Sequence, residues 1–596
     1  MKYRKDIDGL RAFAVVPVIL FHAGFDVFGG GFLGVDIFFV ISGYLITTII
    51  INELERQEFS IVSFYERRAR RILPALFLVM LFSSVMSYYW MLPDELENFG
   101  QSLVATTLFS NNILLTLTSG YWALASEFKP FLHAWSLGVE EQYYIIVPLI
   151  LMGGFYYLKN NILYLLVAVL VLSFTLCIFL GEINPDASFY LLPTRAWELL
   201  VGSIAAVYVN NRGDRNFSFF SSGHLGLLGL FFIIFSIFFF GSKAASPGLY
   251  TIVPVSGAVL IILYARENSF SYKILSNKFV VGVGLISYSA YLWHWPIFVF
   301  ARIYSVVPPS EAVMAALSVL SLVVAYYTWR YVERPFRDRN NFSRKSIFIS
   351  AFFGSLFFIS YGYFLHKEDG LPSRIYSADL SAAADIHIRY NERVFKFKQN
   401  EFGQDGKLNL LVAGNSFARD FINAILESYD LSKVNLVYRN DFKQCLKAVS
   451  DRREEALFQK ADIVVFASGD PDPHCIEEDI RLSEGFGKKI YYVGTKHFGY
   501  NLNWVARLQT EDRMSLYNPL RSETLEKERE FLATVPVKNS ISILEGLKKQ
   551  ESVQITDEKG RLLSPDRTHL TKYGAQLVGQ RVLVSSELGK LIGALQ

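Results

Sequence analysis

The chain changes character near residue 366, and this change limits what it can fold into. Up to that point, long apolar runs are separated by short charged clusters. Beyond it, Lys, Arg, Asp and Glu are dense and the apolar runs shrink to a few residues each. A chain of 596 residues is also too long for one hydrophobic core. The sequence therefore predicts a membrane-spanning half followed by a soluble half.

The first half contains eleven runs that are candidate membrane spans, because a bilayer core needs about 20 apolar residues per helix. The stretch 98–118 is also apolar, but Ser, Thr, Asn and Gln interrupt it, so we interpret it as a buried or interfacial helix. No small-residue cleavage site clearly follows the first run, which favours a retained span over a signal peptide. The predicted spans are 10–26, 33–51, 73–91, 137–156, 163–181, 193–209, 223–241, 247–264, 279–301, 311–331 and 346–365.

The distribution of Lys and Arg predicts the sidedness of these spans, because cytoplasmic loops carry the excess of positive charge. With the N-terminus in the cytoplasm, the basic clusters at 2–5, 56–71, 212–215, 266–278 and 334–345 all lie inside. The opposite loops hold little beyond Lys129, Lys243 and Arg302. Ten spans return the chain to the cytoplasm and the eleventh crosses again. We therefore expect the soluble half on the outer face, which in a bacterium is the periplasm or the cell exterior.

The soluble half shows the pattern of an α/β domain. Strands are predicted at 408–413, 435–439, 462–467, 489–493 and 553–556, and helices at 417–428, 524–533 and 571–589. This alternation indicates a layered fold around a parallel sheet. Residues 367–405 lack clear periodicity and form either a linker or an extension packed on the domain. Cys445 and Cys475 could form a disulfide in an oxidising compartment, and their spacing leaves this open.

Ionisable groups inside predicted spans are costly and therefore functional candidates. Arg11 and His22 share one face of the first span, about 16 Å apart along its axis. His22 could act as a general base or carry an acyl group, or it could simply pack against a neighbouring helix. Asp36 could orient the His22 ring, or it could contact interfacial water. Glu140, Glu141 and His294 would need partners if they are buried.

A dense arginine cluster lies at the expected inner face. It comprises Arg67, Arg68, Arg70 and Arg71. Guanidinium groups suit phosphates, so an anionic acyl donor such as a coenzyme-A thioester is a natural ligand. The alternative is a topology signal that contacts lipid headgroups.

The soluble half carries the residue types of a serine acyl-transfer site. Ser416 lies between a predicted strand and a predicted helix, so backbone N–H groups at the helix N-terminus would face a developing oxyanion. Far downstream, Asp566-Arg567-Thr568-His569 places an acid three residues before a histidine. His569 would take the serine proton, and Asp566 would orient the imidazole.

The first 340 residues resemble the acyltransferase-3 membrane family. The matching segments are Asp8–Ala12 with His22, Gly34–Tyr44, the arginine cluster, Ser136–Tyr143, Trp293–Pro296 and Val332–Phe336. This resemblance implies a ten-span enzyme that takes an acyl group, usually acetyl from acetyl-CoA, for transfer to surface glycans. It implies that His22 is the essential histidine, and that Arg11 and the loop arginines hold the donor.

The last 190 residues resemble an SGNH-type domain, a family of serine esterases and acetyltransferases with a flavodoxin-like sheet. Gly414-Asn415-Ser416 stands where that family has Gly-Asp-Ser, so Asn415 departs from the pattern. Ser468-Gly469-Asp470 occupies the place of the Gly-x-Asn block, which is not recognisable. The fused arrangement resembles bacterial O-antigen and related surface-glycan O-acetyltransferases.

Together these features predict a membrane domain at 1–340, an eleventh helix at 341–366, a linker or extension at 367–405 and an SGNH-like domain at 406–596. The predicted activity is transfer of acetyl from cytoplasmic acetyl-CoA across a bacterial inner membrane to a surface polysaccharide, first of all O-antigen or lipopolysaccharide. No metal is expected, and the net charge of +3 does not indicate nucleic-acid binding.

Three alternatives remain open from the sequence. The acceptor could be peptidoglycan or another glycan. The chain could instead be a membrane-anchored glycan acetylesterase, because water and a sugar hydroxyl are alternative acceptors for the same serine site. A permease would predict inverted repeats or matched broken helices, and the sequence shows no such pairing.

Overall fold

The computed structural model divides the chain into two compact units. The first contains Met1–Ser87, Asn98–Ala301 and Pro309–Lys367, and the second contains Tyr88–Glu97, Arg302–Pro308 and Glu368–Gln596. The structure describes residues 3–118, 126–158, 161–212, 224–241, 247–265, 267, 269–376, 388–403, 405–442, 445–446, 452–469 and 471–595.

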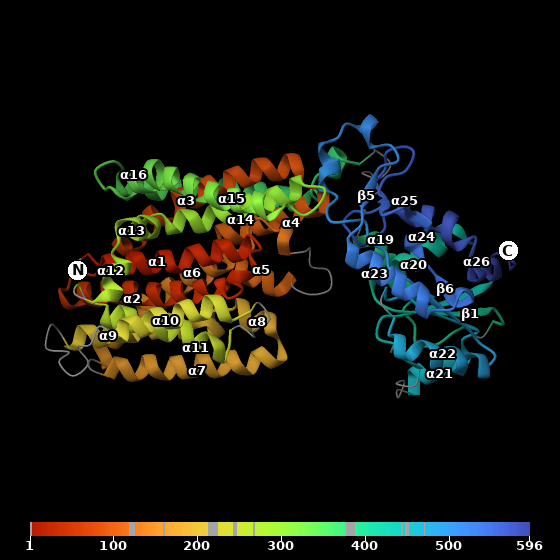
Figure 1. The fold of residues 1–596 in the computed structure, drawn as a ribbon, viewed down its shortest axis with the longest axis horizontal. Coiled ribbons are helices and arrows are strands. Elements are labelled where there is room, and N and C mark those ends of the chain that lie inside the picture. The colour runs from red at the N-terminus through yellow and green to blue at the C-terminus, as the bar shows by residue number, and fades with distance from the viewer. Residues whose placement is uncertain are drawn as a thin grey trace. The chain divides into compact units, whose positions relative to one another are not determined.

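The first unit is built from helices that lie side by side (Figure 1). The helices before residue 200 are α1 Lys5–His22, α2 Gly34–Glu55, α3 Ile61–Trp90, α4 Pro93–Thr107, α5 Asn111–Thr118, α6 Ala134–Gly153, α7 Ile162–Ile183, α8 Pro185–Tyr190 and α9 Leu192–Arg212. The later ones are α10 His224–Phe239, α11 Ile252–Tyr264, α12 Phe270–Leu275, α13 Lys278–Leu285, α14 Ser287–Tyr304, α15 Glu311–Thr328, α16 Arg334–Arg337 and α17 Arg344–Lys367.

Several of these helices have the length and composition to cross a membrane. Within the described ranges there are five, at Gly31–Glu55, Ile61–Trp90, Ile162–Ile183, Glu311–Arg337 and Arg344–Lys367. Only 17% of the apolar window of α7 is buried in the protein, and the same holds for α17. Such apolar, outward-facing helices need lipid around them. Helices occur at all eleven predicted spans, whereas the number that cross the bilayer stays a prediction.

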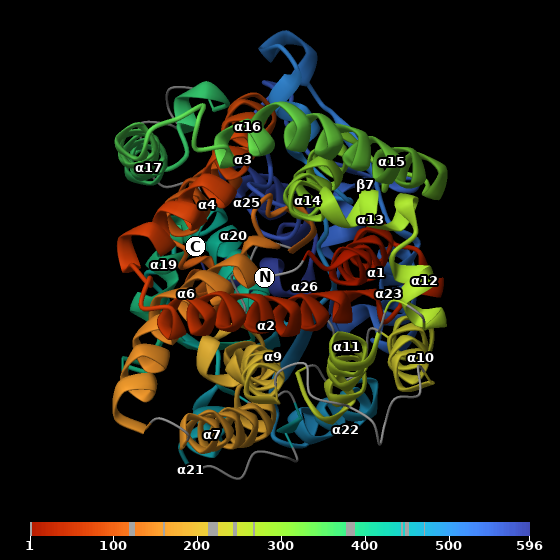
Figure 2. The ribbon, with the colours of Figure 1, turned by 90° about the vertical axis from the view of Figure 1, so that its left-hand side faces the viewer.

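Small residues allow the central helices to pack closely. A Cβ on Gly43 of α2 would lie 1.8 Å from the Leu199 carbonyl oxygen of α9, and a Cβ on Gly202 would lie 2.0 Å from the Val40 carbonyl oxygen. Glycine on both helices therefore permits backbone contact, as is common between membrane helices. In Figure 2, α2, α9 and α7 follow one another across the bundle.

The second unit is an α/β domain with a five-stranded parallel sheet in the order β2-β1-β3-β4-β6. This is the strand order of flavodoxin-like folds, in which ligands bind beyond the carboxyl ends of the strands where the order reverses. Here the reversal lies between β1 and β3. The strands are β1 Leu408–Ala413, β2 Val434–Arg439, β3 Ile463–Phe466, β4 Lys489–Val493 and β6 Ser540–Ile541.

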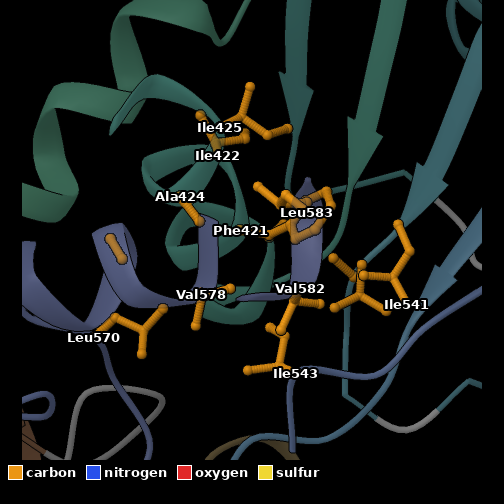
Figure 3. Packing of buried hydrophobic residues seen from close by; sticks show 14 of the residues in the cluster. Phe421, Ile422, Ala424, Ile425, Ile541, Ile543, Leu570, Val578, Val582 and Leu583 are labelled. Carbon is orange, nitrogen blue, oxygen red and sulfur yellow. The ribbon is translucent and has the colours of Figure 1, made fainter. Parts of the chain in front are cut away.

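Helices cover both faces of this sheet, because successive strand residues point to opposite sides. On one face, Leu410 and Val412 pack under α20 (Ser416–Ser428) and α25 (Lys572–Val578). Figure 3 shows Phe421, Ala424 and Ile425 of α20 among Val578 and Leu583. On the other face, Leu411 and Ala413 pack with residues of α21 (Arg452–Lys460), α22 (Pro473–Gly485) and α23 (Ser522–Thr534).

The five predicted strands are all present, but the one predicted at 553–556 does not belong to the parallel sheet. Residues 552–554 form β8, which pairs antiparallel with β5 (Tyr517–Pro519) and β7 (Lys548–Lys549) in a separate sheet. The fifth parallel strand is β6, whose two residues are too few to give a sequence pattern. The predicted helix 571–589 is interrupted by a π-helical turn at Gly579–Leu583 and restarts as α26 (Glu587–Gly593).

Two further segments differ from their predicted form. The apolar stretch 98–118 is split between α4 and α5, and Phe109 at the break has a positive φ of 52°. In the predicted linker, residues 377–387 and 404 lie outside the described residues. The rest includes α19 (Ile388–Glu392) and a 3-10 turn at Arg393–Phe397, where Val394 is buried in the α/β core. This part is a packed extension.

The question of the two soluble cysteines is answered by the structure. Cys445 and Cys475 form a disulfide, with their Cα atoms 5.3 Å apart. The bond joins the segment after β2 to the first turn of α22. It fits the expectation of an oxidising compartment for the soluble half.

Candidate active sites

Ser416 is the first residue of α20 and follows a tight turn at the end of β1. Gly414 in this turn has φ +144°, and a Cβ there would lie 2.2 Å from the Ala467 carbonyl oxygen, so only glycine fits. Asn415 caps the helix, since its side-chain oxygen accepts a hydrogen bond from the Phe417 N–H at 3.0 Å. Ser416 therefore lies at a helix N-terminus beside the point where the strand order reverses, 3% exposed.

Asp566 and His569, the predicted acid and base, are hydrogen-bonded to each other as in a catalytic pair. Asp566 Oδ2 lies 2.6 Å from His569 Nδ1. Asp566 Oδ1 accepts hydrogen bonds from the backbone N–H groups of Thr568 at 2.6 Å and of His569 at 2.8 Å. A carboxylate can only accept here, so Nδ1 carries the ring proton and the neutral imidazole keeps its lone pair on Nε2. That nitrogen is the one a general base needs.

Lys496 connects the segment of His569 to the helix of Ser416, and no sequence pattern predicts this role. Its ammonium lies 2.5 Å from the carboxylate of Asp420, one turn along α20, and both side chains are buried. The same ammonium lies 4.0 Å from the ring centre of Phe417 and donates a hydrogen bond to the Thr568 carbonyl. Lys496 thus contacts the neighbour of Ser416 and the neighbour of His569 at once.

Asn415 connects the serine turn to the end of β3. Its side-chain amide donates a hydrogen bond to the Ser468 carbonyl at 3.2 Å. Gly469 has φ +81°, and its Cβ position would lie 2.5 Å from the Phe417 ring. Ser468 and Gly469, which stand in the place of the Gly-x-Asn block, therefore contact the serine turn, and Asp470 lies outside the described residues. The helix N-terminus at Ser416 remains the predicted source of the oxyanion donor.

A second histidine lies near Asp566 and stays neutral. His497 accepts a hydrogen bond from the Gly499 N–H at Nδ1, 3.1 Å away. Burial lowers the pKa of His497 to about 4, and the nearby guanidinium groups of Arg567 and Arg521 add to this effect. The imidazole is therefore uncharged at neutral pH.

In the helical unit, His22 and His294 form a pair in which His294 is buried and His22 is partly exposed. His22 Nδ1 lies 2.9 Å from His294 Nε2. His294 is completely buried, and its Nδ1 lies 2.7 Å from the Tyr291 carbonyl oxygen. Trp295 stands edge-on to the His22 ring, with the ring centres 4.7 Å apart. Two histidines separated by 272 positions in the sequence are thus brought into direct contact.

A third histidine, His133, also belongs to this group and was missed from the sequence. Its ring centre lies 5.6 Å from that of His294 and 5.4 Å from that of Tyr291, and it is 3% exposed. The Tyr291 hydroxyl bridges to Ser136 Oγ at 2.7 Å and donates to the His133 carbonyl at 2.9 Å. The available signal was a lone histidine in an apolar stretch, three residues before Ser136.

A cavity of about 290 Å³ lies between these helices and is lined by three of the predicted donor-binding arginines. They are Arg11, Arg68 and Arg71. Glu140 also lines the cavity, and its carboxylate accepts a hydrogen bond from Ser42 Oγ at 2.8 Å. Tyr291 belongs to both the cavity wall and the histidine group. A cavity that combines guanidinium groups with many apolar side chains suits a ligand with an anionic head and a small apolar end.

The other two arginines of the cluster face elsewhere. Arg67 pairs with Glu53 at 2.9 Å, and Arg70 pairs with Glu66 at 2.9 Å. Because α3 begins at Ile61, the cluster is helical, and residues three apart share a face. Arg68 and Arg71 lie on the face that lines the cavity, and Arg67 and Arg70 lie on another face, where they pair with acidic residues.

Asp36 is not placed as the orienting acid that the sequence suggested. Its carboxylate lies 2.6 Å from one guanidinium nitrogen of Arg195, and the other terminal nitrogen lies 3.3 Å from the Glu198 carboxylate. All three side chains are at most 1% exposed. The contact at His22 Nδ1 is made by His294 instead. Glu141 is also buried, although the cavity lining within the described residues contains Glu140 and not Glu141.

The chain matches the family described as acyltransferase domain over residues 4–330. It is 31% identical to the peptidoglycan O-acetyltransferase OatA of Listeria monocytogenes over 62% of this chain and 59% of that protein. It is equally similar to the O-acetyltransferase OatA of Staphylococcus aureus strain NCTC 8325 over 57% of this chain and 58% of that protein.

These two matches span less than two thirds of the relatives' own length. A longer match, 26% identical over 83% of this chain, is to a protein of Staphylococcus aureus strain MSSA476 that is provisionally named an O-acetyltransferase. No solved structure matches the chain. The family match covers more than half of the 596 residues and contains the histidine pair and the arginine-lined cavity. This chain is therefore a multi-pass membrane protein that belongs to the acyltransferase domain family, a family of acyl-transferring enzymes.

Proposed function

We propose that the protein is an O-acetyltransferase that takes acetyl from acetyl-CoA and places it on a hydroxyl of a cell-surface glycan, with peptidoglycan as the acceptor. The observation that carries this proposal is the cavity lined by Arg11, Arg68 and Arg71, in a chain that also holds the Ser416 site. Guanidinium groups pair well with the phosphates of a coenzyme-A thioester. Membership of an acyltransferase family supports the same reaction class.

The first transfer would break the thioester bond. His22 acts either by attacking the thioester carbonyl carbon or by taking the proton of an attacking hydroxyl. In both cases the carbon–sulfur bond breaks and coenzyme A leaves as a thiolate that takes up a proton. Both routes need an unprotonated ring nitrogen on His22.

The second transfer would use Ser416. Its Oγ attacks the acyl carbonyl carbon while His569 Nε2 accepts the hydroxyl proton, and the leaving group departs with that proton. A glycan hydroxyl then attacks the serine ester and gives its proton to His569. The ester bond to Oγ breaks, and Ser416 recovers its proton. Asp566 holds the imidazole in the required tautomer throughout, through its 2.6 Å contact with Nδ1.

The acceptor is proposed from the relatives. One of them is named as a peptidoglycan O-acetyltransferase. The comparisons therefore favour peptidoglycan over the O-antigen acceptor that the sequence resemblance placed first. An SGNH-like role for the α/β unit rests on the Ser416 turn and the Asp566–His569 pair. The proposed orientation, with the N-terminus in the cytoplasm and the α/β unit outside, rests on the distribution of Lys and Arg.

The decisive experiment compares peptidoglycan from cells that carry the chain, lack it, or carry a variant. Ester-linked acetate on muramic acid is measured by mass spectrometry after mild base release. We expect His22→Ala and Ser416→Ala each to lower the rate at which this acetate is added by at least about 1,000-fold, as loss of a nucleophile or base does. Full acetylation in His22→Ala would overturn the proposal.

Matched controls separate chemistry from folding. Ser428→Ala removes a serine at the far end of the same helix, where Oγ donates a hydrogen bond to the Ala424 carbonyl. His224→Ala removes an exposed histidine at the start of α10. Both controls should keep normal acetylation. Loss in Ser416→Ala alone would confine the chemistry to the α/β unit. More acetate in cells that lack the chain would instead identify an acetylesterase.

A further inference from the structure

The hydrogen bonds of His294 determine which nitrogen of that ring is protonated. His294 Nδ1 lies 2.7 Å from the Tyr291 carbonyl oxygen and 3.2 Å from the Ala290 carbonyl oxygen. Carbonyl oxygens only accept hydrogen bonds, so Nδ1 must carry a proton. A charged imidazolium with no exposed surface among aromatic rings would bear a large desolvation cost. His294 is therefore neutral, with its lone pair on Nε2.

That lone pair is aimed at His22. The two ring planes are within 8° of each other, the ring centres are 5.2 Å apart and Nδ1 of His22 is 2.9 Å from Nε2 of His294. A nitrogen–nitrogen contact this short between parallel rings places them edge to edge in one plane, along the direction of the lone pair. Because His294 accepts in this bond, His22 must donate.

We propose that His294 is a positioning residue that holds His22 as the Nδ1–H tautomer, so that Nε2 of His22 carries the lone pair used in acyl transfer. This inference rests on the proposed function of His22. The hydrogen bonds from the Tyr291 carbonyl through His294 to His22 fix the tautomer of His22, as Asp566 fixes that of His569. Here the acceptor is a neutral imidazole in place of a carboxylate. No charge then needs to be buried beside the ring.

The arrangement also explains why Asp36 is not needed at His22. Asp36 lies against Arg195, and a carboxylate that is already paired contributes less as an orienting acceptor for a second group. A purely structural histidine at position 294 would need good packing but not an acceptor atom facing His22. A positioning role and a purely structural role for His294 therefore predict different effects on activity when His294 is replaced by a residue of similar size.

The test uses the full chain in proteoliposomes with acetyl-CoA as the donor and release of free thiol as the signal. His294→Gln keeps an acceptor oxygen, whereas His294→Met is of similar size and leaves only a weakly accepting sulfur. We expect His294→Met to lower kcat about 100-fold or more, since a wrong tautomer costs up to about 10,000-fold in a serine protease. KM for acetyl-CoA should stay within about twofold, and His294→Gln should recover kcat to within about tenfold of the wild type.

A spectroscopic measurement decides the tautomer whether or not acetyl-CoA is consumed. Protein labelled with ¹⁵N histidine is compared with the His22→Ala variant, and the difference spectrum gives the His22 nitrogens. We expect a protonated Nδ1 in the wild type and in His294→Gln, and a shift toward protonated Nε2 in His294→Met. A protonated Nε2 in the wild type, or equal kcat for the Gln and Met variants, would overturn the inference.

The two proposals fail in different ways. If the wild type released no thiol from acetyl-CoA, the proposed function would fail, and the nitrogen spectrum would still decide the tautomer. The proposed function would stand if the wild type and the control His224→Met were active and His22→Ala were inactive. If His294→Met then had the same kcat as the wild type, the inference would fall.

Discussion

Lys496 and Asp420 form an ion pair of 2.5 Å in which both side chains are almost completely buried. The pair joins the loop after β4 to the helix that begins at Ser416. Since Lys496 also donates to the Thr568 carbonyl, the ion pair holds the histidine segment against the serine helix. A buried pair of this kind adds little stability compared with apolar residues, but breaking it is costly.

We predict that Lys496→Met destabilises the α/β unit by about 3–5 kcal/mol, because it leaves the Asp420 carboxylate buried without its cation. The double variant Lys496→Met/Asp420→Leu should regain most of this stability. It should not regain full activity, since the bond to Thr568 stays broken. Thermal unfolding and hydrolysis of an activated acetyl ester provide the two measurements. Wild-type kcat in the double variant would show that Lys496 has no positioning role.

The arginine cluster offers a matched pair of substitutions on one helix. Arg68 lines the cavity, whereas Arg67 pairs with Glu53. We predict that Arg68→Ala raises KM for acetyl-CoA about 10- to 100-fold, the loss of one or two charge-assisted hydrogen bonds. Arg67→Ala should change KM by less than about twofold, since Arg67 faces Glu53 and the cavity lining among the described residues does not contain it. Equal effects of the two variants would argue against donor binding in the cavity.

The location of the serine site could be predicted because its signals are local. Gly414-Asn415-Ser416 follows an apolar strand directly, and Asp566 and His569 are three residues apart. The four long strands of the parallel sheet were predictable for the same reason. The two-residue β6 was not, and neither was the antiparallel pairing of β8, because its partners are set by long-range packing.

The membrane site depended on contacts that a single sequence does not reveal. His22 and His294 are 272 positions apart, and both lie in apolar surroundings that fit ordinary packing equally well. The division of the arginines into two faces follows from the start of α3 at Ile61. The predicted span began at 73, so this helical register was not available for the cluster. Lys496 was missed because isolated lysines are usually exposed.

Asp566 offers a test of tautomer control in the α/β unit. We predict that Asp566→Asn lowers kcat for acetyl-ester turnover by up to about 10,000-fold, because an amide can donate to His569 Nδ1 and favour the wrong tautomer. Its Oδ1 can still accept from the Thr568 and His569 N–H groups, so the melting temperature should change little. Asp557→Asn, at an acid paired with Arg561, is the control and should keep kcat. A kcat above one tenth of the wild type in Asp566→Asn would contradict the triad.

Asp479 predicts a pH dependence of stability near the disulfide. Burial raises the pKa of Asp479 to about 6, although its carboxylate accepts bonds from the Leu446 N–H and the Tyr492 hydroxyl. The folded state therefore holds a proton that the unfolded state releases at lower pH. The contribution of Asp479 to the free energy of unfolding falls as pH rises from about 4 to about 6, by at most about 3 kcal/mol, and stays level above that range.

We therefore predict that Asp479→Asn stabilises the protein at pH 7, because the amide keeps an acceptor for the Leu446 N–H and carries no charge to bury. The gain in melting temperature should disappear below about pH 4, where Asp479 is protonated in both states. Thermal unfolding of the two proteins from pH 4 to 8 measures this difference. Glu484→Gln, at an exposed pair with Lys538, is the control and should show no comparable change with pH. A gain for Asp479→Asn that is equal at pH 4 and pH 7 would mean that packing, and not the buried charge, sets its stability.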